Sequence, residues 1–239
     1  MDNIRNGNFT SSEIFNLLSA DKKGVVGNGK PALTYIAEKN MERRVRLPLE
    51  NESNAKPLSW GKLLESRINN LLPTDYIIYN DITFVHPEYS FWVGSPDLEK
   101  FDTSCDTKCP ITRKSFCQLV DPIYEGFDGM GAMNKIIENH KDGLKYFYQI
   151  VSNAIIRGKE YGELIVYMPY KSELEAIKNL ADGNRNYYWI WAADNEELPY
   201  LEDNGYYKNI NIIRFKIPEI EKEKLTNAVI NASKFLHTN

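Results

Sequence analysis

Hydrophobic residues recur at helical spacing in the first third of the chain, which predicts three helices there. The first is predicted over residues 10–20, with Thr10 or Ser11 as its cap. A proline after the following glycine-rich loop predicts a second helix over 32–44, because proline is well tolerated at the first helical position. The third is predicted over 59–72, where one apolar stripe contains Leu64, Ile68, Leu71 and Leu72.

The pattern changes in the middle of the chain, where aromatic and β-branched residues alternate with polar ones. This alternation predicts strands over 76–85, 91–95 and 104–110, and helical spacing returns over 132–157. The remaining segments are a strand at 163–169, a helix at 172–181, strands at 186–191 and 209–215, and a helix at 218–236. The order indicates an α/β fold with a central mixed β-sheet flanked by helices.

Composition agrees with an ordinary globular protein, since 42% of the 239 residues are hydrophobic and 26% are charged. This length suits one domain, and we expect residues 1–239 to form it. Apolar runs stay well short of the roughly 18 residues that a membrane span needs, and the first residues lack an apolar signal core. We therefore expect a cytoplasmic protein with no membrane partner.

Three cysteines, Cys105, Cys109 and Cys117, lie close together in the sequence and raise the question of a zinc site. A structural zinc site needs a fourth ligand and usually paired CxxC spacing, and both are missing here. An odd number of cysteines without a signal peptide favours free thiols in a reducing compartment.

The net charge of −4 argues mildly against a nucleic-acid partner. A site that holds divalent metal ions must nevertheless concentrate carboxylates, and a phosphate-binding rim can be local. The candidate rim is the basic segment 39–46, with Arg43, Arg44 and Arg46 as its DNA-binding residues. The alternative interpretation is a solvated helix face.

Candidate chemistry gathers around the strand predicted at 104–110. Asp106 and Lys108 project from one face, because residues two apart share a face of a strand. Pro96 tends to end the preceding strand, so a hairpin can bring the Asp97 carboxylate beside Asp106. Adjacent carboxylates repel each other, and a hard divalent cation relieves that repulsion. This arrangement predicts a magnesium site for phosphodiester hydrolysis, in which Lys108 orients or deprotonates the attacking water. Asp-x-Lys by itself is more often a surface ion pair.

Further motifs accompany this strand in a fixed order: WGKLLE from Trp60 to Glu65, HPEY from His86 to Tyr89, GSPD from Gly94 to Asp97, DTKCP from Asp106 to Pro110, and YFYQ from Tyr146 to Gln149. In order and spacing they resemble the phage-type recombination exonucleases. These form the YqaJ-like viral recombinase or lambda exonuclease family of the PD-(D/E)xK nuclease superfamily. The resemblance is strongest over residues 9–170 and implies a restriction-endonuclease-like core.

The resemblance assigns roles to individual residues. It implies that the catalytic set is Glu65, Asp97, Asp106, Lys108 and Gln149. It also implies that Mg²⁺, or Mn²⁺ in its place, is held by the three carboxylates together with the backbone carbonyl of Thr107. Ser12 matches the position that helps to hold the DNA end, and Arg5 is expected near the 5′ phosphate.

Two positions depart from the family pattern. Asp106 replaces the commoner glutamate, which shortens that ligand arm by one methylene group. Leu98 replaces the glycine that usually follows the first aspartate, which alters a turn next to the metal site. Neither change removes a ligand.

Several other residues have two interpretations. Asp81 is either an additional carboxylate at the site or, as we favour, a surface residue at a strand end. His86 is expected to pack or form hydrogen bonds rather than catalyse, and no serine–histidine or cysteine–histidine arrangement is supported. The aromatic cluster at 187–191 fits base stacking or alternating strand packing equally well.

The expected function is a magnesium-dependent deoxyribonuclease that acts on double-stranded DNA ends, from 5′ to 3′, to generate single strands for phage-type recombination. The resemblance further implies a homo-oligomer encircling DNA, a single-strand annealing protein as partner, and a phage or prophage origin in a bacterial host. Two rivals stay open. One is another endonuclease or repair nuclease of the superfamily, and the other is a degenerate module that binds DNA without cutting it.

Overall fold

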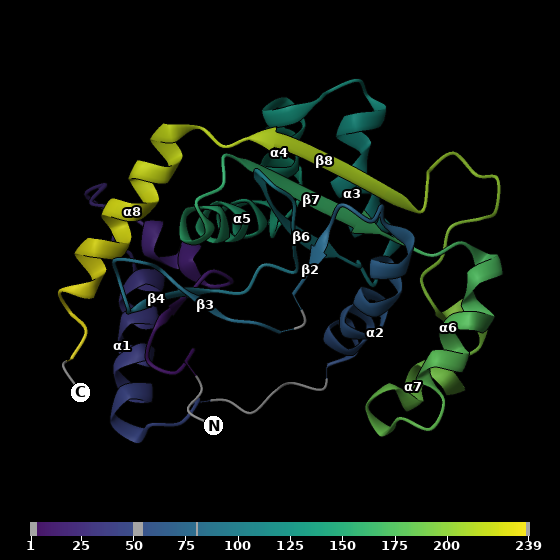
Figure 1. Ribbon diagram of the computed structural model, residues 1–239, viewed down its shortest axis with the longest axis horizontal. Coiled ribbons are helices and arrows are strands. Elements are labelled where there is room, and N and C mark those ends of the chain that lie inside the picture. The colour runs from purple at the N-terminus through teal and green to yellow at the C-terminus, as the bar shows by residue number, and fades with distance from the viewer. Residues whose placement is uncertain (1–3, 50–54, 80, 238–239) are drawn as a thin grey trace.

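The computed structural model describes residues 4–49, 55–79 and 81–237 and contains two β-sheets surrounded by helices (Figure 1). The larger sheet has five strands in the order β2 (Ile77–Ile78), β5 (Leu98–Glu99), β6 (Thr103–Lys108), β7 (Tyr161–Tyr167) and β8 (Ile210–Lys216). β6 and β7 run parallel, whereas the other neighbouring pairs are antiparallel. The predicted α/β class with a mixed sheet is therefore confirmed.

The smaller sheet has three short strands in the order β1 (Phe9–Thr10), β4 (Trp92–Gly94) and β3 (Phe84–Val85). β1 pairs in parallel with β4. The pairing extends one residue beyond β1, because the backbone amide of Ser11 donates to the carbonyl of Val93 at 3.0 Å. This sheet brings the N-terminal segment to the strand that precedes Asp97.

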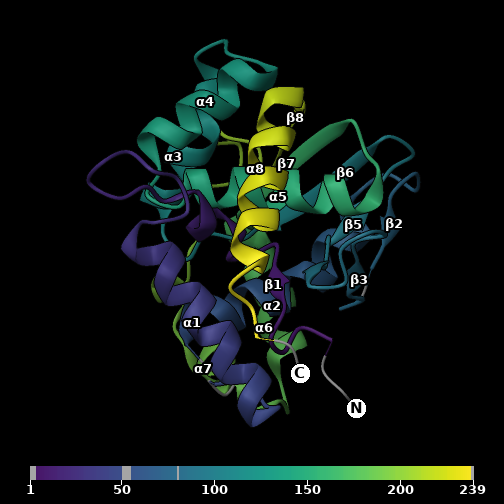
Figure 2. The same ribbon diagram turned by 90° about the vertical axis from the view of Figure 1, so that its left-hand side faces the viewer.

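Helices cover both faces of the larger sheet (Figures 1 and 2). They are α1 (Lys30–Val45), α2 (Lys56–Leu71), α3 (Arg113–Tyr124), α4 (Gly129–Asn139), α5 (Gly143–Arg157), α6 (Leu174–Ala181), α7 (Tyr188–Ala192) and α8 (Glu219–Ser233). Short 3-10 helices cover Ile14–Leu18, Lys171–Glu173, Arg185–Tyr187 and Asn195–Glu197. In the described part of the chain no helix is long and apolar enough to cross a membrane.

Strand β7 separates two hydrophobic cores, because its successive side chains point to opposite faces. Leu164 and Val166 belong to the core under α3, α4, α5 and α8, whereas Ile165 and Tyr167 belong to the core under α2, α6 and α7. Burial on both faces explains why this segment reads as an almost continuous apolar run.

The helix predicted over 10–20 is mostly wrong. Thr10 lies in strand β1, and only a 3-10 helix at Ile14–Leu18 is formed, with Glu13 in place of the predicted cap. The backbone amides at the start of the segment pair with β4, so they are not available to begin a helix there. Tertiary pairing overrides the local helical pattern.

The helix predicted over 132–157 is two helices, α4 and α5, separated at His140. The α4–α5 turn is tight, because a Cβ added to Gly143 would lie 2.3 Å from the carbonyl oxygen of Ile136. The prediction also missed α3 entirely. Thr112 caps α3 by accepting a hydrogen bond from the amide of Ser115 at 3.2 Å.

The strand predicted over 186–191 is wrong, because this segment forms helical turns that end in α7. Ile190 is buried, whereas Tyr188 and Trp191 are exposed. The indole nitrogen of Trp189 donates to Ser59 Oγ at 2.8 Å and thereby attaches α7 to α2. Packing against α2 therefore accounts for Trp189, while Tyr188 and Trp191 remain on the surface.

The predicted strand over 76–85 forms only its two ends, β2 and β3, and residue 80 lies outside the described residues. The other predicted elements are present within a few residues of their expected limits. These are the helices α1, α2, α6 and α8 and the strands β4, β6, β7 and β8.

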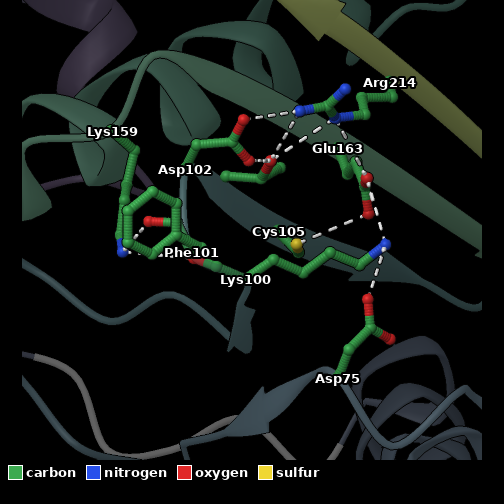
Figure 3. A network of polar contacts seen from close by, with 9 residues as sticks. Asp75, Lys100, Phe101, Asp102, Cys105, Lys159, Glu163 and Arg214 are labelled. Carbon is green, nitrogen blue, oxygen red and sulfur yellow. Dashed lines mark hydrogen bonds and ion pairs between the residues drawn. The ribbon is translucent and has the colours of Figure 1, made fainter.

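A buried network of charges supports the β5–β6 hairpin from the face opposite Asp106 (Figure 3). Glu163 on β7 is 1% exposed and lies between Lys100, at 3.5 Å, and Arg214, at 3.6 Å. Lys159 Nζ donates to the carbonyls of Lys100 and Phe101 at the tip of the hairpin, at 3.2 and 3.0 Å. The hairpin that carries the candidate site is thus fixed at both its strands and its tip.

Candidate active site

Asp97 and Asp106 are brought together by the β5–β6 hairpin. The antiparallel register pairs Leu98 with Cys105, and extending it by one residue sets Asp97 opposite Asp106. Asp97 Oδ2 accepts a hydrogen bond from the backbone amide of Thr107 at 2.7 Å. The hairpin predicted after Pro96 is confirmed, although its first strand is β5 and not β4, which belongs to the smaller sheet.

Lys108 lies on the same face of β6 as Asp106, as the strand alternation predicts. Its Nζ is 2.6 Å from Asp106 Oδ2, and the Asp106 side chain is almost completely buried while that of Lys108 is 21% exposed. Lys108 Nζ also lies 4.9 Å from the centroid of the Tyr146 ring on α5. The ammonium group is therefore held at the edge of the site by an anion and an aromatic face.

Gln149, on α5, connects the two charged residues. Its Nε2 donates to Asp106 Oδ1 at 2.7 Å, and its Oε1 accepts from Lys108 Nζ at 3.4 Å. An amide can do both at once because it carries a donor and an acceptor. The resemblance places Gln149 in the catalytic set, and the structure shows the two contacts that it makes there.

Glu65 projects from α2 toward the same place. The helical WGKLLE segment has the expected conformation, with Trp60 and Leu64 fully buried on the inner side of α2. Glu65 lies on the other side and lines a cavity of about 250 Å³ together with Asp97, Lys108 and Gln149. The structure thus brings four of the five predicted catalytic residues around one cavity, and the fifth, Asp106, is buried in contact with Lys108 and Gln149.

The N-terminal segment closes another side of this cavity. Arg5 and Ser12 both line it, as the resemblance implies for the residues that hold a DNA end. Ser11 lines it as well, and sequence analysis missed this residue. Ser11 is fixed by the 2.7 Å contact between its Oγ and Ser152 Oγ on α5. The resemblance at Ser12 pointed to this segment, but only the pairing of β1 with β4 shows which serines face the cavity.

Asp81 is a surface residue, as the sequence favoured, but its place in the backbone differs from the strand end that we expected. It is exposed and has a left-handed backbone conformation, with φ of 57°, and does not end a strand. It lines the catalytic cavity and an adjoining one of about 200 Å³, together with Glu65 and Asp97. Asp81 is therefore a fourth carboxylate at the mouth of the site.

Charge repulsion and burial act together on the carboxylates. Burial raises the pKa of Asp97 well above its usual value, and the charge of Asp106 raises it further, while Lys108 opposes both effects. Burial likewise raises the pKa of Glu65. Solvent reaches this side chain, but the cavity that it lines surrounds it with protein. Burial alone would lower the pKa of Lys108, but the charges of Asp106 and Asp97 raise it, so Lys108 remains a cation.

The oxygen donors at this site fit a partly hydrated magnesium ion. In the three described segments, no three histidine, cysteine or acidic side chains converge into a ready-made metal cluster. Magnesium, however, keeps several waters and takes only one or two carboxylates from a protein. Asp97 and Asp106 supply two carboxylates with hard oxygen donors. Asp106 Oδ2 is buried and forms the ion pair with Lys108, but it accepts no hydrogen bond from the described residues. Ligation by Asp97, Asp106, Glu65 and the Thr107 carbonyl stays a prediction.

The structure gives Arg43 a different role from the predicted DNA rim. Its guanidinium donates to the carbonyls of Gly7 and His237 at 2.7 and 2.8 Å and to Asn8 Oδ1 at 3.2 Å. Arg43 therefore ties both ends of the described chain to α1, and three of its five N–H donors are used within the protein. Arg44 and Arg46 are both exposed, at the end of α1.

His86 and the three cysteines behave as the sequence predicts. The His86 ring stacks on Trp92 with centroids 4.9 Å apart, and its Nδ1 accepts from the amide of Glu88 at 3.1 Å. All three cysteines are free thiols. Burial, and secondarily the nearby Glu163 carboxylate, raises the pKa of the Cys105 thiol.

Comparisons with known proteins agree with this fold. No protein-family model and no curated protein sequence matches the chain. Solved structures do match. An alkaline exonuclease, LHK-Exo, from Laribacter hongkongensis has a TM-score of 0.59 at 14% identity, with 97% of this chain and 89% of that chain covered. LHK-Exo in complex with dAMP gives a TM-score of 0.57 at 14% identity over the same shares. A phage-related exonuclease from Haemophilus somnus 129PT gives 0.59 at 13% identity, with 95% and 92% covered. At these identities the matches show a shared fold.

Proposed function

We propose that this protein is a metal-dependent nuclease that hydrolyses DNA phosphodiester bonds. The observation that carries the proposal is the convergence of Asp97, Asp106 and Lys108 at one end of the β5–β6 hairpin, with Lys108 Nζ 2.6 Å from Asp106 Oδ2. Glu65 and Gln149 complete the site from two different helices. The fold shared with exonuclease structures over almost the whole chain supports the same class of reaction.

Each side chain has a distinct task in the proposed reaction. Asp97 and Asp106 would hold Mg²⁺, with Glu65 and the Thr107 carbonyl as further donors. When bound, the metal ion supplies a water of lowered pKa and neutralises charge on the scissile phosphate. Lys108 is kept as a cation by its ion pair, so it orients the attacking water and stabilises charge on the phosphate rather than removing a proton.

Gln149 is proposed to be a positioning residue. By donating to Asp106 and accepting from Lys108, its amide keeps the carboxylate and the ammonium in one geometry before substrate arrives. Pre-set dipoles and charges of this kind lower the reorganisation that the reaction requires.

The finer proposal is an exonuclease acting on double-stranded ends, from 5′ to 3′, in phage-type recombination. It is supported by the motif order WGKLLE, HPEY, GSPD and DTKCP, and by the position of Arg5 and Ser12 at the cavity, where a terminal phosphate would be held. The LHK-Exo structure with dAMP is of a related fold with a nucleotide. A homo-oligomer around DNA and a single-strand annealing partner belong to the same proposal.

End-labelled linear duplexes, incubated with magnesium, manganese or a chelator, test the reaction. Release of nucleotides with either metal and none with the chelator is the expected result. No metal-dependent release from any DNA would support instead the degenerate, binding-only module.

Covalently closed circular duplex separates the exonuclease from its nearer rival. We expect the linear form to be degraded while the closed circle persists. Cutting of the closed circle would show an endonuclease or repair nuclease built on the same site.

A further inference from the structure

A separate cavity, of about 600 Å³, lies between the start of α3 and the end of α4, which are neighbours in Figures 1 and 2. Polar and basic side chains dominate its lining, among them Lys114, Ser115, Gln118, His140 and Lys141. None of these five residues has a role in the nuclease site described above.

The half-buried Tyr146 contacts one residue of each site, Lys108 of the candidate active site and His140 of this cavity. Lys108 Nζ lies 4.9 Å from the centroid of the Tyr146 ring, and that centroid lies 5.4 Å from the centroid of the His140 ring. The His140 ring is therefore no more than about 10 Å from the Lys108 ammonium. A distance of about 10 Å corresponds to about three nucleotide steps of 3.4 Å along one DNA strand. Tyr146 is only partly buried, so it offers an aromatic ring close to both residues.

The hydrogen bonds of His140 set the chemistry of Ser115. The backbone amide of Asp142 donates to His140 Nδ1 at 3.1 Å, so the proton of the neutral ring is on Nε2. Nε2 lies 2.7 Å from Ser115 Oγ and donates to it. His140 therefore cannot act as a base toward Ser115, and the Ser115 hydroxyl keeps its own proton to donate to an acceptor in the cavity.

The charge of the lining favours an anion. Lys114 and Lys141 are both exposed, and Lys141 is only loosely paired with Asp142 at 3.9 Å. Glu138, the acidic residue of the lining, is already bound to Lys135 at 2.8 Å. The cavity thus presents ammonium groups and a hydroxyl donor in a chain whose net charge is −4.

We propose that this cavity binds the phosphodiester backbone of the DNA strand held in the active site, a few nucleotides from the scissile bond. The inference rests on the proposed nuclease function. A DNA strand held at Lys108 for cleavage lies next to this cavity and can enter it. Lys114 and Lys141 contact phosphate oxygens, Ser115 donates to one of them, and Tyr146 contacts the intervening sugar or base.

The test compares Lys114→Ala/Lys141→Ala with the matched control Lys22→Ala/Lys23→Ala. The control changes the charge by the same amount at two exposed lysines in the loop before α1. Binding of a labelled single-stranded oligonucleotide and of a labelled duplex is measured in chelator at several salt concentrations. For the single strand, loss of two phosphate contacts reduces the slope of log affinity against log salt by about 1.4. The control keeps the wild-type slope, and a cavity variant that also keeps it overturns the proposal.

A second measurement uses cleavage with magnesium. A dinucleotide substrate is too short to reach both sites, so kcat/KM for it should be equal in wild type and in the cavity variant. On a long strand the variant should show a KM raised at least several-fold and an unchanged kcat, and equal KM values would overturn the proposal. If wild type binds DNA but does not cut it, the nuclease function fails while the salt slopes still decide the cavity. Absence of DNA binding by wild type overturns both.

Discussion

Gln149 and Asp106, which are 43 positions apart in the sequence, are joined by a 2.7 Å hydrogen bond from Nε2 to Oδ1. The acceptor carboxylate is almost fully buried and also carries the ion pair with Lys108. The bond therefore fixes the side chain of a proposed metal ligand on β6 relative to α5. It links one helix of the larger core directly to the chemistry.

Gln149→Met tests that link. Methionine has a similar length but neither donates to Asp106 nor accepts from Lys108, so both side chains lose a positioning contact. A charge-assisted hydrogen bond is worth about 1.5–3 kcal/mol, which corresponds to a drop in kcat/KM of roughly tenfold to a hundredfold. Gln149→Glu should be at least as inactive, because it places a second carboxylate against Asp106. Steady-state kinetics with near wild-type values in either variant would contradict the assigned role.

Asp97→Asn and Asp106→Asn should both lose magnesium binding and lower cleavage by about a hundredfold or more. Their stabilities should differ. Asp97→Asn removes a charge that burial and Asp106 disfavour, so its melting temperature in chelator should be equal to or above that of wild type. Asp106→Asn removes the partner of Lys108 and should melt lower. Calorimetric titration, melting curves and a nuclease assay on both variants decide the point, and retained cleavage in either would remove it from the metal site.

Lys108→Ala distinguishes the lysine from the carboxylates. A lysine is not a ligand for a hard, oxygen-seeking cation, so metal and DNA binding should persist while kcat falls by about a hundredfold or more. Titration of manganese into this variant and into Asp106→Asn provides the comparison. If both variants lose metal binding to the same extent, the proposed division of roles is wrong.

Arg43→Ala should destabilise the protein by about 1–3 kcal/mol, because three hydrogen bonds to Gly7, Asn8 and His237 are lost. It should leave the salt dependence of DNA binding unchanged. Arg44→Ala/Arg46→Ala should have the opposite profile if these residues form a DNA rim, with little loss of stability and a flatter salt slope. Urea denaturation and DNA titrations separate the two cases. A salt slope that matches wild type in Arg44→Ala/Arg46→Ala would assign both residues to a solvated helix face.

Glu163→Gln should lower the free energy of unfolding by about 1–3 kcal/mol, because it leaves Lys100 and Arg214 facing a neutral amide at a buried position. Asp75→Asn is the matched control, since Asp75 contacts the same Lys100 but its side chain is 62% exposed. The control should change stability by less than about 1 kcal/mol. Equal effects in denaturant titrations would show that burial of Glu163 contributes nothing to the hairpin.

The sequence by itself determined the elements whose pattern is repeated over several turns or residues. The apolar stripe of α2 and the apolar run of β7 are both found where expected, because each is dictated by burial of one or two faces. Strand alternation also placed Asp106 and Lys108 on one face of β6, since that relation depends only on the two-residue period. The family resemblance carried by the motifs implies that Glu65 and Gln149 belong to the site, without any knowledge of distances.

Only the tertiary structure decided relations that depend on partners far away in the chain. The local pattern predicts a helix from Thr10 onward. The backbone amides and carbonyls at its start instead pair with β4, and Ser11 then faces the cavity. The same is true of Arg43, whose charge suggests DNA until its contacts with Gly7 and His237 are seen. Residue type and periodicity specify which side chains can be buried or charged, whereas hydrogen-bond partners are chosen by the packing of distant segments.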